Sequence, residues 1–128
     1  YIRLCIHNDI IAGGVFFSKS FLETYGYFDE RYKLLEDWPM WLRVAHAGAK
    51  IVYCPFNAIK YRSDVGFGTS INPIYMKDKR EVFANEIEAY KNEIGTLNYL
   101  KAKLSFAFVN STTVRKTYGL IKRRGRNQ

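Results

Sequence analysis

Two adjacent carboxylates, Glu36 and Asp37, are the side chains of this sequence best suited to acid–base chemistry. An ionised carboxylate can act as a general base, removing the proton of a hydroxyl group while the hydroxyl oxygen attacks an electrophilic carbon. The residues that follow predict a helix, whose dipole and free N–H groups would stabilise an ionised Asp37. Glu36 would oppose this effect through like-charge repulsion. The alternative is structural, with one of the two carboxylates only capping the helix.

The helix predicted over residues 37–47 determines where the carboxylate pair lies. Its apolar residues recur at spacings of three and four, and Pro39 stands in the first turn, where proline is tolerated. A second helix is predicted over residues 19–25, because Ser18 is a favourable N-cap and Gly26 a favourable C-cap. Local chemistry thus predicts both ends of this second helix.

Apolar, β-branched and aromatic residues predict strands on either side of these helices. Residues 10–17 have the composition of a buried strand, interrupted by Gly13 and Gly14. Paired glycines in a strand mark a bulge or the close approach of a ligand or another backbone, and a simple chain bend is the alternative. Two further short strands are predicted over residues 50–55 and 58–62. The first part of the chain is therefore predicted to be α/β.

The second part of the chain is predicted to be helical. Apolar stripes indicate a charged helix over residues 78–94 and another helix over 97–109, and both stripes would pack on the α/β part. The glycines and polar residues of 63–73 predict a loop between the two parts. We expect an α/β part over residues 1–70 and a C-terminal helical appendage with a basic tail over 71–128.

The composition indicates a globular chain with excess positive charge. Its 128 residues are 48% hydrophobic and 16% aromatic, and the net charge is +8. The basic tail after residue 115 suits a solvated terminus, an anionic membrane surface or nucleic acid. No stretch reaches the roughly 18 to 20 apolar residues of a membrane span. Cys5, Cys54, His7 and His46 lack the spacing of a metal site, so we expect no metal ligands in this chain.

Five segments, in this order, resemble the second half of the catalytic core of family 2 glycosyltransferases. They are IAGGVFFSK at 11–19, YGYFDE at 25–30, EDWPMWLR at 36–43, GAKI at 48–51 and YR at 61–62. The resemblance implies a partial GT-A fold, the fold of nucleotide-diphospho-sugar transferases, followed by the helical appendage. It also implies an inverting enzyme that transfers a sugar from a nucleotide-sugar donor to a saccharide or lipid-linked acceptor.

The same resemblance implies roles for individual residues. Asp37 corresponds to the catalytic base, with Glu36 beside it. Gly13 and Gly14 would keep the floor of the acceptor cleft open. Trp38 would lie either where the acceptor approaches or where the helix packs on the sheet.

Donor binding is only partly represented in this sequence. Arg62 could approach the donor diphosphate, with a structural salt bridge as the alternative. There is no Asp-x-Asp motif and no first βαβ half, which bind the nucleotide and a divalent cation (Mn²⁺ or Mg²⁺) in this family. We therefore expect a fragment of a longer enzyme, inactive by itself. The Gln-x-x-Arg-Trp motif of processive synthases is also missing from the sequence, which favours transfer of a single sugar.

A second class of function stays open, a basic and aromatic binding module for nucleic acid or a membrane surface. The run Lys60-Tyr61-Arg62 interleaves cations with an aromatic ring, as single-strand binding requires. The acidic pair and the acidic residues of 81–93 would repel phosphate, so we expect no nucleic-acid partner. We expect a cytoplasmic protein at the inner face of the membrane, held there by its basic tail, with homodimerisation through exposed apolar surface as an option.

Overall fold

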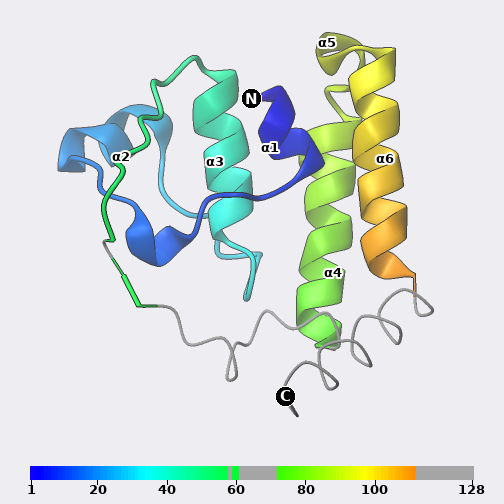
Figure 1. The fold of residues 1–128 in the computed structure, drawn as a ribbon, viewed down its shortest axis with the longest axis horizontal. Coiled ribbons are helices and arrows are strands. Elements are labelled where there is room, and N and C mark those ends of the chain that lie inside the picture. The colour runs from blue at the N-terminus through cyan, green and yellow to red at the C-terminus, as the bar shows by residue number, and fades with distance from the viewer. Residues whose placement is uncertain (58, 61–71, 112–128) are drawn as a thin grey trace.

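A computed structural model describes residues 1–57, 59–60 and 72–111 of the chain. In Figure 1, the short helix α1 lies between α3 and the pair formed by α4 and α6. The helix α4 runs into η2, a π-helical turn, and α6 returns alongside η2 after the short α5. The bounds are α1 Ile2–Ile6, the 3₁₀ turn η1 Ala12–Gly14, α2 Lys19–Tyr25, α3 Asp37–His46, α4 Pro73–Val82, η2 Phe83–Glu88, α5 Lys91–Ile94 and α6 Thr96–Asn110.

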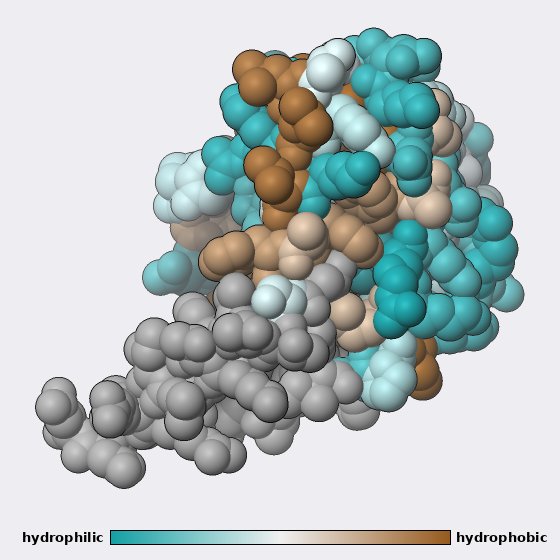
Figure 2. Space-filling model, turned by 90° about the vertical axis from the view of Figure 1, so that its right-hand side faces the viewer, coloured by the Kyte–Doolittle hydropathy of each residue, from teal (hydrophilic) through white to brown (hydrophobic). Residues whose placement is uncertain are grey.

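The core forms where α1, α3, η2 and α6 meet. The helix α3 contributes more of these side chains than any other element, because apolar residues cover the face that it turns inward. The buried hydrophobic side chains of this cluster are Leu4, Cys5, Tyr32, Leu35, Trp38, Met40, Trp41, Leu42, Val44, Val82, Phe83, Ile87, Ile94 and Ala102. Hydrophobic residues are also exposed, and Figure 2 shows them gathered in a column on the side of the molecule that carries α6.

The two helices predicted around the carboxylate pair are confirmed. The hydroxyl of Ser18 accepts a hydrogen bond from the backbone N–H of Phe21 at 3.2 Å, which caps the start of α2. Gly26 ends α2 with a φ of +84°, a conformation that glycine adopts without the strain of a side chain. The helix predicted over 37–47 is α3, Asp37–His46, with Pro39 in its first turn.

The later helices are confirmed in part. The helix predicted over 97–109 is α6, and Gly95, with a φ of +78°, separates it from α5. The helix predicted over 78–94 begins earlier, because the side chain of Asn72 accepts a hydrogen bond from the N–H of Ile74 at 2.9 Å and caps α4. It is then divided by η2 into α4 and α5. None of the helices in the described ranges is long and apolar enough to cross a bilayer.

The prediction of an α/β fold is wrong for the described residues, which contain helices and turns but no strand. Within residues 10–17, the backbone at Gly13 and Gly14 closes a 3₁₀ turn. The N–H of Gly14 donates to the carbonyl of Ile11 at 2.9 Å, and the N–H of Val15 donates to that of Ala12 at 3.2 Å. These local bonds use the backbone groups that a strand would offer to a neighbouring strand.

The strand predicted over residues 50–55 does not form either, and most of the one predicted over 58–62 lies outside the described residues. A strand is stable only when its backbone pairs with another strand and one face is covered. Here Val52 and Tyr53 are 64% and 86% exposed. The described part of the chain therefore does not form a partial GT-A fold with a helical appendage, because the sheet of that fold is missing from it.

Candidate functional site

The carboxylate pair lies at the start of α3. Glu36 is exposed and occupies the N-cap position, but its side chain accepts no hydrogen bond from the first turn among the residues that the structure describes. Asp37 is the first residue of α3 and is partly buried. The side-chain amide of Asn8, in the segment that follows α1, donates to Oδ1 of Asp37 at 3.4 Å. The site thus combines residues far apart in the sequence.

The surroundings of Asp37 raise the pKa of its carboxyl. Burial is the largest cause, because it removes water from the ionised form, and the charge of Glu36 is the second. The nearby N–H of Trp38 and the amide of Asn8 lower the pKa in part. The indole N–H of Trp41 acts in the same direction, although it is buried and reaches hydrogen-bonding geometry with none of the described residues. Asp37 therefore accepts a proton more readily than an ordinary aspartate does.

Trp38 joins α3 to α1. Its side chain is 5% exposed, and its indole N–H donates to the carbonyl oxygen of Leu4 at 2.8 Å. This bond uses the one polar group of the side chain inside the core. The structure therefore places Trp38, predicted as an acceptor-binding residue, in the packing between α3 and α1, where it also borders a cavity.

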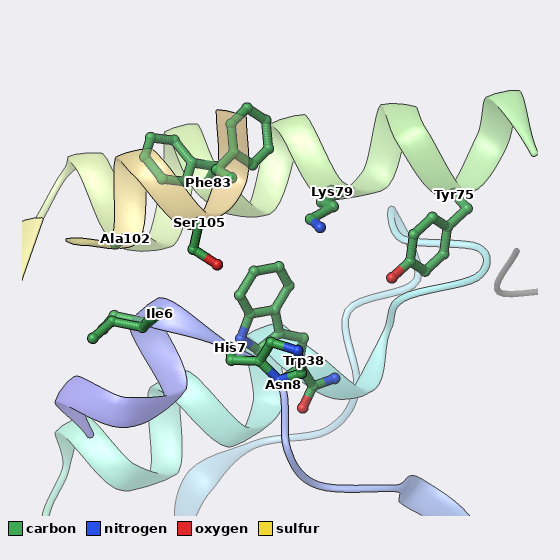
Figure 3. Close-up of a pocket in the computed structure, with 11 residues that line it drawn as sticks. Ile6, His7, Asn8, Trp38, Tyr75, Lys79, Phe83, Ala102 and Ser105 are labelled. Carbon is green, nitrogen blue, oxygen red and sulfur yellow. The ribbon is translucent and has the colours of Figure 1, made fainter. Parts of the chain in front are cut away.

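This cavity, of about 140 Å³, lies between the end of α1, the start of α3 and the helices α4 and α6. Figure 3 shows the amine of Lys79 and the hydroxyl of Ser105 directed into the space above Trp38. Lys79 is only 9% exposed. The lining residues are Cys5, Ile6, His7, Asn8, Trp38, Tyr75, Lys79, Phe83, Ala102, Ser105 and Phe106. Since Asn8 also contacts Asp37, the cavity and the carboxyl share a wall residue.

A second, open hollow of about 260 Å³ lies on the Glu36 side of the pair. Its lining residues are Phe28, Asp29, Glu30, Tyr32, Lys33 and Glu36. The guanidinium of Arg31 bonds to both carboxylate oxygens of Asp29, at 2.6 Å in the shortest contact, and lowers the pKa of that carboxyl. The pKa of Asp29 is thus below the ordinary value of an aspartate and that of Asp37 is above it, because Asp29 pairs with a cation whereas Asp37 is partly buried beside another carboxylate.

Asp78 positions the loop that leads to the carboxylate pair. Its side chain is 1% exposed, and Oδ2 accepts the backbone N–H groups of Lys33 and Leu34, both at 2.7 Å. Sequence reasoning missed this residue because the contact spans more than forty positions. A signal was present, since Asp78 lies one turn before the buried Val82, and an aspartate on the apolar stripe of a helix needs a polar partner.

The other predicted site residues are not brought to Asp37 by any contact in the described structure. Among the described residues, a side chain added at Gly13 or Gly14 would meet only Ile59 Cδ1, at 3.9 and 3.8 Å. Neither glycine lines the cavity or the hollow. Arg62, predicted to approach the donor diphosphate, lies outside the described residues.

Metal ligands were not predicted in this chain. In the described ranges, no group of three or more His, Cys, Asp or Glu side chains could hold a metal ion. Both histidines pair with carboxylates instead: His7 Nδ1 lies 2.8 Å from Asp9, and His46 Nε2 lies 2.7 Å from Glu93.

Comparisons with known proteins identify no relative of this chain. No protein-family model matches the chain, and neither a curated protein nor a solved structure is significantly similar to it. The residues around Asp37 and the resemblance of the five sequence segments are therefore the basis on which a function can be proposed.

Proposed function

We propose that this chain provides the acceptor-side part of an inverting glycosyltransferase in which Asp37 is the general base. In the proposed reaction, Asp37 takes the proton of an acceptor hydroxyl while the hydroxyl oxygen bonds to the anomeric carbon of the donor sugar. The bond between that carbon and the nucleoside diphosphate breaks, and the diphosphate leaves with the electron pair. The acceptor is a saccharide or a lipid-linked saccharide.

The environment of Asp37 is the observation that carries this proposal. A general base is most effective when its pKa lies near the working pH, and the raised pKa of Asp37 moves it in that direction. Perturbed carboxyls are enriched at functional sites. Asp37 itself lines neither hollow, but it lies between Glu36, which lines the open hollow, and Trp38, which lines the cavity. The structural alternative is weakened for Glu36, because its side chain does not cap α3 within the described residues.

The hollow beside Glu36 is the proposed position of the acceptor. It combines the ring of Phe28 with the carboxylates of Glu30 and Glu36. Aromatic rings stack on the apolar faces of sugars, and carboxylates accept hydrogen bonds from sugar hydroxyls. In this arrangement Glu36 holds the acceptor next to the base.

The donor site is proposed to depend on groups beyond those described. The nucleotide-sugar diphosphate would be neutralised by a divalent cation, Mn²⁺ or Mg²⁺, with Arg62 as an additional cation. We propose that the full-length enzyme supplies the metal ligands, and that it works in the cytoplasm at the inner face of the membrane, where lipid-linked acceptors are found.

Transfer by the full-length enzyme, measured with a panel of radiolabelled nucleotide sugars and a lipid extract as acceptor, tests the proposal. Asp37→Asn should abolish transfer and leave donor binding intact, because only the proton acceptor is lost. Glu36→Gln should weaken acceptor binding and leave some turnover. Glu23→Gln is the matched control, since it removes an exposed carboxylate charge that lines neither the hollow nor the cavity. Turnover of Asp37→Asn equal to that of the control would remove Asp37 from its proposed role.

A further inference from the structure

The helix α6 carries apolar side chains on two faces. Its inner face, with Tyr99, Ala102 and Phe106, packs against the core. The other apolar face consists of Leu97, Leu100, Leu104 and Phe108, which are 66%, 48%, 69% and 64% exposed. We call these four residues the outer stripe. They belong to the side of the molecule on which Figure 2 shows a column of hydrophobic residues.

The outer stripe is continuous along the helix. A helical rotation of about 100° per residue places all four side chains within an arc of roughly 80°, over roughly 16 Å of helix axis. Single exposed apolar residues are common on soluble proteins, but a contiguous row of large ones marks an interaction surface. The core does not need these four side chains, because the opposite face of α6 already packs against it.

The net charge of the chain is concentrated in the part of the sequence that begins with α6. The sequence contains no acid after Glu93, whereas eight Lys and Arg residues follow that position, among them Lys101 and Lys103 of α6. The remaining 12 Lys and Arg residues are balanced by the 12 acids of the chain. The whole net charge of +8 therefore lies in residues 94–128.

The positive charge of residues 94–128 favours an anionic partner for the outer stripe. Lys101 borders the outer stripe on one side and Lys103 on the other, where its amine lies 5.9 Å from the centre of the Tyr99 ring. A second copy of the chain would bring two strongly positive regions together, which repel each other. An apolar stripe between lysines is instead the pattern of helices that lie in the interface of an anionic bilayer.

We propose that α6 docks on an anionic membrane surface, with the outer stripe inserted among the acyl chains and the flanking lysines at the headgroups. The helix lies parallel to the membrane plane. The inference does not depend on the glycosyltransferase proposal, because it uses no residue of the candidate active site.

Cosedimentation of the full chain with lipid vesicles tests this proposal. Wild-type protein should bind vesicles of phosphatidylcholine mixed with phosphatidylglycerol, and bind vesicles of phosphatidylcholine alone much more weakly. The double variant Leu104→Ser/Phe108→Ser should lower the partition coefficient on the order of 100-fold, since two half-inserted side chains contribute about tenfold each. The matched control Val52→Ser/Phe56→Ser removes two residues that are 64% and 63% exposed elsewhere, and should bind within about twofold of wild type.

Three results would overturn the proposal. Unchanged binding of the stripe variant would mean that the basic tail alone holds the protein on the vesicles. An equal loss in the control variant would mean that binding is nonspecific. Binding to polyuridylate or self-association in sedimentation velocity, without vesicle binding, would assign the surface to another partner. Circular dichroism of each variant checks that the helices are retained.

Discussion

Asp78 should contribute more to stability than its position on an apparently charged helix suggests. Its Oδ2 accepts both backbone N–H groups, from Lys33 and Leu34, inside the protein. A hydrogen bond to an ionised group is worth about 1.5–3 kcal/mol and a neutral one about 0.5–1.5 kcal/mol. Asp78→Asn can present an oxygen to both N–H groups and loses only the charge, at about 1 kcal/mol per bond. Asp78→Ala loses the acceptor itself, and we expect a cost of about 4 kcal/mol.

Urea unfolding and thermal unfolding, both followed by circular dichroism at pH 7, measure these differences. For a chain of this length, 1 kcal/mol corresponds to roughly 3–5 °C in Tm, so Asp78→Asn should lose about 6–10 °C and Asp78→Ala about twice that. Lys77→Ala is the control on the same helix, because its pair with Glu81 is exposed and contributes less than about 0.5 kcal/mol. The reasoning is refuted if the Asn and Ala variants lose equal stability, since the shared oxygen would then have no role.

Three further predictions are tested by unfolding or by thiol labelling. Asp37→Asn should raise the Tm at pH 7 but not at pH 3. The pKa of Asp37 is higher in the folded protein than in the unfolded chain, so ionisation of this carboxyl lowers the stability once the pH exceeds the unfolded-state pKa. A Tm at pH 7 equal to that of the wild-type protein would contradict the raised pKa. Trp38→Phe should cost about 1–2 kcal/mol in urea unfolding by leaving the buried Leu4 carbonyl unpaired; an unchanged midpoint would show that water replaces the bond. Ellman's reagent should label the exposed Cys54 rapidly and Cys5 only as the protein unfolds, because burial hides Cys5 and raises the pKa of its thiol; fast double labelling would show that the α1 contact opens.

The parts of the fold that depend on neighbours in the sequence were predictable. The cap at Ser18 and the glycine after α2 involve contacts within four positions. The same holds for α3 and α6, whose apolar spacing alone indicates a helix. The short helix α1 was missed, because five residues without a capping side chain give no such signal.

The errors concern contacts that the sequence does not encode locally. An apolar run such as residues 10–17 becomes a strand only if another strand pairs with it, and the pairing partner is not specified by the run itself. Asn8 and Asp78 act on the carboxylate pair and its loop from distant positions. Sequence reasoning therefore found the carboxylate pair but not the residues that hold it.

Within the described residues, the start of α3 lacks the side-chain cap found at α2 and α4, as the starts of α1, α5 and α6 also do, but it places a partly buried carboxyl beside a second carboxylate. Ser18 and Asn72 each cap the helix that follows with a side-chain oxygen. Glu36 stands at the same position of α3 without such a bond among the described residues, and its charge and the burial of Asp37 both make the ionised pair less stable. Residues that lower the stability of the fold and are not needed for its structure are expected at functional sites, and the proposed base, Asp37, is such a residue.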